Sequence, residues 1–194
     1  AMLLVAAFTI NGCASNSPLE GWVTLIDGDK GLENFNRLGD ANWRAEGGAI
    51  VADKGKGGHL VTKNSYKDFE IYAEFYAESN TNSGIFIRAT DPKKIGADTA
   101  YEVNIWDTRP DPSYGTGGIV NLATVNPMPK AGGKWNTYEI YAKGAQMTVK
   151  LNGVVTAHAQ DSKNPSGPFT LQYGMAGDKP GAVIKWRKVM VRTL

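Results

Sequence analysis

The sequence predicts an all-β fold in which two antiparallel sheets pack together as a β-sandwich. From Gly21 onward, short runs of alternating apolar and polar residues recur, as expected for strands that bury one face. The chain contains 23 glycines and 9 prolines, which punctuate these runs. No run has the period of an amphipathic helix, and no repeat of solenoid length occurs. Many short strands are best accommodated in two packed sheets.

Each expected strand is a short alternating run bounded by turn residues. The runs are residues 23–25, 43–46, 49–52, 59–62, 69–78, 84–88, 101–106, 119–122, 136–143, 146–151, 169–173 and 182–191. The Gly47-Gly48 and Asn152-Gly153 pairs favour tight hairpins, because both pairs tolerate positive φ angles. Two long loops, at 90–100 and 108–118, flank the strand expected at 101–106. Long loops in a compact domain often carry function.

Length and charge indicate one domain that does not bind nucleic acid. The 194 residues suffice for one large core, and we assign residues 21–194 to a single domain. The 21 Lys and Arg residues nearly balance the 19 Asp and Glu residues, and the charges are scattered. The densest basic stretch is 185–192, and its alternation with Val and Met predicts a charged edge strand.

The first 20 residues predict export and lipidation. A short apolar run ends at Gly12-Cys13 and is followed by a polar spacer, and this order resembles a bacterial lipobox. We therefore expect residues 1–20 to be a residual lipoprotein signal and spacer, with Cys13 as the lipidated residue. The protein would then be an exported bacterial lipoprotein facing the periplasm, anchored in the outer membrane of a Gram-negative host. The alternative is a buried first strand with an inert thiol.

Three sets of polar and aromatic side chains recur at alternate strand positions. Glu70, Tyr72, Glu74 and Tyr76 share one face of the strand at 69–78, opposite a fully apolar face. Two further sets share a face on the next two strands: Phe86 with Arg88, and Glu102, Asn104 and Trp106. We expect these sets to lie on one surface, with Arg88 beside Glu102.

Such a surface suits carbohydrate. Aromatic rings stack on the apolar face of a pyranose, and carboxylates, amides and guanidinium groups bind its hydroxyls. The alternative is an ordinary solvated sheet face, on which Arg88 and Glu102 form only a cross-strand ion pair. Patterning alone does not decide between them.

Other chemistries find little support in the sequence. The only histidines are His59 and His158, and neither has a Cys or carboxylate at a zinc-ligand spacing. The single cysteine, Cys13, precedes the domain and excludes an intramolecular disulfide. No nucleophile elbow, P-loop or dinucleotide fingerprint occurs. We therefore predict no metal site.

Several short motifs, taken in order, resemble one known family over 21–194. They are Gly21-Trp22 with Leu25-Ile26-Asp27-Gly28; Asn42-Trp43-Arg44 with Glu46-Gly47-Gly48-Ala49-Ile50; Tyr66-Lys67-Asp68-Phe69-Glu70; Asn82-Ser83-Gly84-Ile85-Phe86-Ile87-Arg88; Tyr101-Glu102-Val103; Gly133-Lys134-Trp135-Asn136-Thr137-Tyr138; and Leu151-Asn152-Gly153. The sequence resembles the 3-keto-disaccharide hydrolase domain family, formerly a domain of unknown function. The resemblance implies a jelly-roll sandwich of the concanavalin A-like lectin/glucanase type.

The resemblance also implies a reaction and a set of residues. Members are associated with cleaving glycosides oxidised at C3, so the expected activity is that of a hydrolase or lyase acting on 3-keto-glycosides or disaccharides. The motif positions imply Glu102, Arg88 and Asp107 as catalytic residues. Substrate contacts are expected from Tyr72, Glu74, Asn104, Trp106, Gln172 and Tyr173. The chemistry leaves room for a divalent cation as an electrophile.

The sequence-based hypothesis assigns three roles and leaves two alternatives open. Glu102 would be the acid/base, and Arg88 would orient it or bind an oxyanion. Trp106 or Tyr72 would stack on the sugar. The alternatives are a noncatalytic carbohydrate-binding module and a purely structural lipoprotein, because this fold hosts binding domains as readily as enzymes. A perturbed carboxylate in an enclosed cleft would favour the enzyme, and an open aromatic platform the module.

Overall fold

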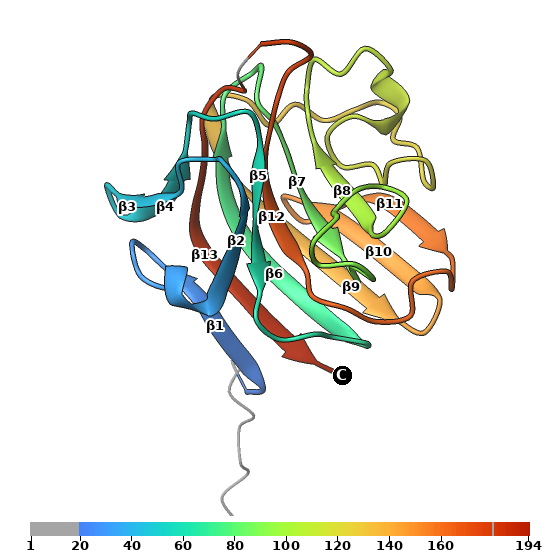
Figure 1. The fold of residues 1–194 in the computed structure, drawn as a ribbon. Helices are drawn as coiled ribbons and strands as arrows, with labels where there is room; N and C mark the ends of the chain where they lie inside the picture. The colour runs from blue at the N-terminus through green and yellow to red at the C-terminus, as the bar shows by residue number, and fades with distance from the viewer. Residues whose placement is uncertain (1–19, 180) are drawn as a thin grey trace, which may run out of the picture.

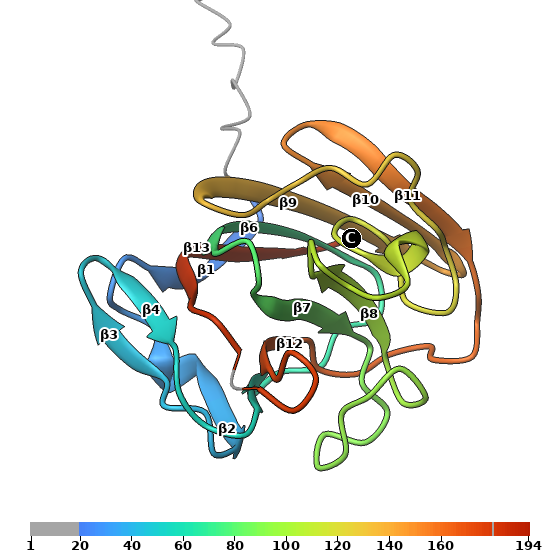
Figure 2. The same cartoon turned by 90° about the horizontal axis from the view of Figure 1, so that it is seen from above.

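The computed structural model describes residues 20–179 and 181–194, which form two antiparallel sheets packed face to face (Figure 1). The predicted two-sheet β-sandwich is therefore confirmed. Viewed from above, the two sheets form separate layers, and the five-stranded layer is the one that faces the viewer in Figure 1 (Figure 2). The predicted signal segment with Cys13 lies outside the described residues, apart from Glu20.

The larger sheet contains eight strands. Its order is β11 (Val154–Gln160), β10 (Gln146–Leu151), β9 (Lys134–Lys143), β6 (Phe69–Ala77), β13 (Ile184–Thr193), β4 (Ala49–Ala52) and β3 (Arg44–Glu46), and β1 (Trp22–Asp27) also pairs with β13. The long strands β6, β9 and β13 form its centre, and each alternates buried and more exposed residues over much of its length. This alternation buries one face of the sheet against the other layer.

The smaller sheet contains five strands. Its order is β2 (Phe35–Gly39), β5 (Gly58–Thr62), β12 (Thr170–Gly174), β7 (Asn82–Ile87) and β8 (Tyr101–Ile105). Two short 3-10 turns, η1 (Leu32–Asn34) and η2 (Pro112–Tyr114), lie in loops. None of the helices in the described part of the chain is long and apolar enough to cross a membrane.

The core lies between the two layers and is continuous. Phe69, Ile71 and Phe75 of β6 face inward, as do Leu171 of β12 and Trp186 of β13. Trp186 is fully buried, and its ring lies 5.7 Å from that of Phe75. Burying large side chains of this kind contributes about 1.5–3 kcal/mol each, which offsets the entropy of ordering the chain.

The predicted hairpin turns are present. Gly47 and Gly48, between β3 and β4, have φ angles of 61° and 75°. Asn152 and Gly153, between β10 and β11, have φ angles of 52° and 80°. Both turns therefore have the positive φ angles that their residues favour.

Some strand predictions are wrong. β2 and β11 were not expected, since Phe35–Gly39 has few apolar residues and Val154–Gln160 begins with two exposed valines. Residues 119–122 form only isolated bridges, because Asn121 has a φ angle of 60° that interrupts extended backbone. The basic strand β13 is not an edge strand, since it pairs with β6 on one side and with β1 and β4 on the other.

Candidate functional site

The outer face of the five-stranded sheet gathers polar side chains from three strands. Asn104 of β8 pairs with Gly84 of β7, which pairs with Gln172 of β12, which in turn pairs with His59 of β5. Glu102 stands two residues from Asn104 and therefore on the same face. Because Gly84 carries no side chain, bare backbone separates Asn104 from Gln172.

Glu102 lies in an apolar environment. Its strand partner is Phe86, which packs outward against Ala89, Ala100 and Ile95. These residues belong to or adjoin the segment between β7 and β8, which projects beyond the sheet in Figure 2. Burial raises the pKa of the Glu102 carboxyl to about 7, although the nearby Arg109 guanidinium lowers it. None of the hydrogen bonds found among the described side chains involves this carboxyl group.

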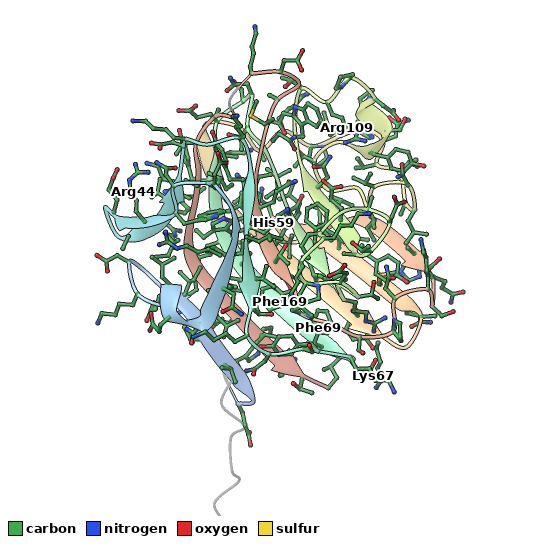
Figure 3. All side chains as sticks on the ribbon, in the orientation of Figure 1. Arg44, His59, Lys67, Phe69, Arg109 and Phe169 are labelled. Atoms are coloured by element: carbon green, nitrogen blue, oxygen red, sulfur yellow. The ribbon has the colours of Figure 1, made fainter. Side chains whose placement is uncertain are left out.

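The segment after β8 brings an aromatic ring and a cation to the site. Trp106 follows β8, and its backbone N–H donates to Thr116 Oγ1 at 3.0 Å. The Arg109 guanidinium lies 5.6 Å from the centre of the Trp106 ring. Figure 3 shows Arg109 in the segment at the upper right, above the sheet that faces the viewer. Arg109 therefore contacts Trp106 and acts electrostatically on Glu102.

Four buried polar atoms of this face have no hydrogen-bond partner. They are Asn104 Oδ1, Trp106 Nε1, Arg109 Nε and Gln172 Oε1, out of six such atoms among the described residues. Buried polar groups without partners are rare and costly in folded proteins. Two of these atoms are hydrogen-bond donors and two are acceptors. They show that polar groups gather beneath this face of the sheet. We call Glu102, Asn104, Trp106, Arg109 and Gln172 the Glu102 group.

His59 lies beside the Glu102 group and was missed as a site residue by sequence reasoning. Its Nδ1 is 2.9 Å from Thr170 Oγ1, and its ring meets the Phe86 ring edge-on at 5.1 Å. Burial lowers the pKa of His59 to about 4, so the ring is neutral near pH 7. Figure 3 shows it near the middle of the front sheet. Its alternation with buried Leu60 could have identified its outward face, but its sheet partner Gln172 is more than 100 residues away.

Asp107 stands next to the Glu102 group but does not face it. It is 8% exposed, and its carboxylate accepts hydrogen bonds from Thr116 Oγ1 at 2.6 Å, Gly132 N at 2.9 Å and Ala131 N at 3.0 Å. These contacts join the segment after β8 to the segment before β9. Asp107 therefore has a structural role, because these hydrogen bonds hold the loop that carries Trp106 and Arg109.

The prediction that Arg88 shares the face of Glu102 is wrong. β7 ends at Ile87, and Arg88 has a φ angle of 54°, so the strand alternation no longer determines its direction. Its guanidinium donates to the carbonyls of Lys67 at 2.8 Å and Gly144 at 2.7 Å and lies over the Phe69 ring. Arg88 is 1% exposed and joins chain segments that are far apart in sequence; Figure 3 labels two of the residues that it contacts, Lys67 and Phe69.

Tyr173 also differs from its predicted place. It follows Gln172 on β12, so alternation turns it into the core, where it is fully buried. Its hydroxyl donates to the Gly181 carbonyl at 2.8 Å. Only one of two consecutive strand residues can face outward, and the structure places Gln172 there.

Tyr72 and Glu74 lie on the opposite side of the molecule. Their strand, β6, belongs to the eight-stranded sheet and not to the sheet of β7 and β8, so the expected common surface does not form. The Tyr72 hydroxyl donates to Glu74 Oε1 at 2.9 Å, and Glu74 pairs with Arg187 at 2.5 Å. Glu70 pairs with Arg192 on the same face. These groups satisfy one another across the sheet.

The residue types around Glu102 do not make a metal centre. In residues 20–179 and 181–194, no three His, Cys, Asp or Glu side chains come close enough together to hold a metal ion. The other members of the Glu102 group are amides, an indole and a guanidinium, which are poor substitutes for carboxylate and imidazole ligands.

The buried Glu102 predicts a pH-dependent cost in stability. Its pKa rises from 4.5 when exposed to about 7 in the fold, which corresponds to about 3 kcal/mol. Both states are protonated below pH 4.5, so the cost is absent there; it develops as the pH rises and is complete above pH 7. Glu102→Gln should therefore match the wild type in urea unfolding at pH 4 and exceed it by about 1–3 kcal/mol at pH 8. Equal stability of the two proteins at pH 8 would contradict this account of Glu102.

Comparison of the structure with solved structures finds the same fold in carbohydrate-related proteins. A candidate glycosyl hydrolase from Parabacteroides distasonis ATCC 8503 is 23% identical, with a TM-score of 0.72 over 89% of this chain and 99% of that one. A second candidate glycosyl hydrolase from the same organism is 18% identical, with a TM-score of 0.66 over 90% of this chain and 89% of that one. Carbohydrate binding module CBM66 from Bacillus subtilis is 15% identical, with a TM-score of 0.58 over 89% of this chain and 96% of that one. At these identities the likeness establishes the fold.

The sequence itself identifies the family. No curated protein matches the chain. The family model of the 3-keto-alpha-glucoside-1,2-lyase-like domain matches residues 21–192, which is nearly the whole predicted domain. A function related to carbohydrate is supported by this match and by the neighbours of the fold. The chain belongs to the 3-keto-alpha-glucoside-1,2-lyase-like domain family.

Proposed function

We propose that this protein is an enzyme that cleaves 3-keto-glucosides on the outer face of the five-stranded sheet, with Glu102 as the proton-transferring residue. The observation that carries the proposal is the Glu102 carboxyl, which is buried beside Phe86 and has its pKa raised to about 7. A group with this pKa can both accept and release a proton near neutral pH. Polar side chains stand near it, since Asn104, Trp106, Arg109 and Gln172 each carry a buried polar atom without a partner.

The reaction begins with elimination. A ketone at C3 acidifies the C2–H bond, so the Glu102 carboxylate can remove that proton. The electron pair of the C–H bond forms the C1–C2 double bond, and the C1–O bond to the aglycone breaks. The departing oxygen takes up a proton from solvent and leaves as an alcohol. Water then adds its hydroxyl group to C1 and gives its other proton to solvent, while C2 regains a proton from Glu102, so the net reaction is hydrolysis.

Arg109 takes the electrophilic role that the sequence suggested for Arg88. Its guanidinium is close enough to Glu102 to affect the pKa of that carboxyl, and its Nε has no partner. Negative charge develops on the C3 oxygen as the C2 proton leaves, and a fixed cation stabilises it. Trp106, against whose ring Arg109 lies, is partly exposed and would offer ring surface to the sugar.

A noncatalytic binding module is the alternative function. The likeness to a carbohydrate-binding module in fold is compatible with it. A module has no need of a carboxyl whose pKa is moved into the physiological range, because such a group weakens the fold above pH 7. The Glu102 environment therefore favours the enzyme.

Turnover of 3-keto-glucosides tests the proposal. Because the base must be ionised, kcat/KM should rise about tenfold per pH unit below pH 7 and level off above it. Release of the aglycone from methyl and aryl 3-keto-glucosides, followed between pH 5 and 9 with and without a chelator, would give this profile. The same glucosides with an unoxidised C3 are the control, and we expect no turnover of them. Binding of 3-keto-glucosides without cleavage at any pH would support the module instead.

We also propose that the protein is an exported lipoprotein acylated at Cys13, on the sequence pattern alone. Cys13→Ser should then move the protein from the membrane fraction to the soluble fraction of a bacterial host. Metabolic labelling with a fatty-acid analogue, compared between the two proteins, measures the modification directly. Equal fractionation and no label on either protein would contradict the proposal.

A further inference from the structure

A shallow groove continues the outer face of the five-stranded sheet from Gln172 toward β2. It has a volume of about 340 Å³ and is lined by Leu38, Gly39, Lys56, Gly57, Gly58, His59, Gln172, Tyr173, Gly174 and Met175. Gln172 belongs to both the groove and the Glu102 group. The groove therefore begins where the proposed reaction site ends.

Glycines form a large part of the lining of the groove. A Cβ on Gly39 would lie 2.5 Å from the Gly57 carbonyl oxygen, and one on Gly58 would lie 2.7 Å from the Leu38 carbonyl oxygen. Gly39 and Gly57 also have φ angles of 83° and 121°, which side chains strongly disfavour. The close approach of these backbones requires glycine, so this part of the lining is backbone without side chains. A lining of this kind leaves room for a planar group.

The walls of the groove are mostly apolar. Leu38 and Met175 are partly exposed hydrophobic side chains, and a thioether adapts to irregular aromatic surfaces. The third wall, His59, is neutral near pH 7. Lys56 is the only charged side chain in the lining, and no carboxylate is present. A sugar ring would need several paired donors and acceptors here, so the lining suits an aromatic group better.

We infer that the groove binds a planar, apolar aglycone, so that the substrates are aryl 3-keto-glucosides and not 3-keto-disaccharides. The inference rests on the proposed function, because it places the reacting sugar over Gly84, between Asn104 and Gln172. β8 and β12 are separated by β7, so Asn104 and Gln172 stand on the order of 10 Å apart. That distance accommodates one pyranose ring, and its aglycone then enters the groove.

Binding to a Glu102→Gln background tests the inference without turnover. Calorimetry should give a dissociation constant at least about tenfold lower for the 4-nitrophenyl than for the methyl 3-keto-glucoside. A glucosyl aglycone should give no such gain over methyl. Leu38→Gln and Met175→Gln, each made separately, should reduce the aryl advantage at least about fivefold, because both place an amide beside the ring. Val155→Gln, on the exposed surface of β11, is the matched control and should leave the ratio unchanged.

The opposite results overturn the inference. It fails if both groove variants keep the aryl advantage, if Trp106→Ala removes it instead, or if the glucosyl aglycone binds best. Cleavage by the native chain without aryl preference would overturn the groove assignment and leave the proposed function intact. Aryl-selective binding without any cleavage would overturn the proposed function and leave the groove assignment intact. Absence of binding to every ligand would overturn both.

Discussion

Glu102→Gln is expected to lower kcat for 3-keto-glucosides by about 10²–10⁴-fold, because the amide keeps the shape of the carboxyl and cannot take the C2 proton. Dissociation constants should change by less than about tenfold, since Trp106, Arg109 and Gln172 remain. The measurement is kcat from aglycone release at pH 8, with binding of the same substrate measured on the variant. At that pH most of the wild-type Glu102 is ionised.

Two comparisons make this result specific. Glu74→Gln is the matched control, since Glu74 is a carboxylate on the outer face of the other sheet and should leave kcat unchanged. Arg109→Gln should lower kcat while leaving the Glu102 carboxyl in place, and it should raise the pH at which activity develops, because a cation that lowers the pKa of Glu102 is removed. Full activity of Glu102→Gln would refute the mechanism.

Asp107→Ala should destabilise the fold by about 3 kcal/mol, because it removes a buried carboxylate and leaves its donors without partners. These donors are Thr116 Oγ1 and the N–H groups of Ala131 and Gly132. For a domain of this size the loss corresponds to a fall in Tm of roughly 6–12 °C. Calorimetry or thermal unfolding at pH 7 measures it.

A matched control separates the loss of these hydrogen bonds from the effect of removing any aspartate from the same loop. Asp111 is exposed in the same segment, and its Oδ1 accepts a hydrogen bond from Ser113 N at 3.1 Å. Asp111→Ala should therefore change Tm by only a few degrees. Asp107→Ala should also weaken substrate binding in the folded protein, since Trp106 and Arg109 lose their anchor. A Tm equal to that of Asp111→Ala would show that Asp107 is not the anchor we describe.

The sequence alone was enough to predict the two-layer fold and the faces of individual strands. Period-two alternation is a local property, so Phe69, Ile71 and Phe75 could be assigned to the core and Glu102 and Asn104 to one shared face. The Asn152-Gly153 hairpin is equally local, because its φ angles depend on its own residues. The same rule could have excluded Tyr173 once Gln172 was placed outward.

The tertiary structure decided which faces meet. Alternation does not say to which sheet a strand belongs, and β6 joins β9 and β13 while β7 joins β8 and β12. This pairing separates Tyr72 and Glu74 from Glu102 and brings His59 and Gln172 toward it. The direction of Arg88 depends on one left-handed residue at a strand end, and Arg109 reaches the site through a loop held by Asp107. These placements depend on contacts between residues far apart in the chain, whose geometry is set by packing and not by local pattern.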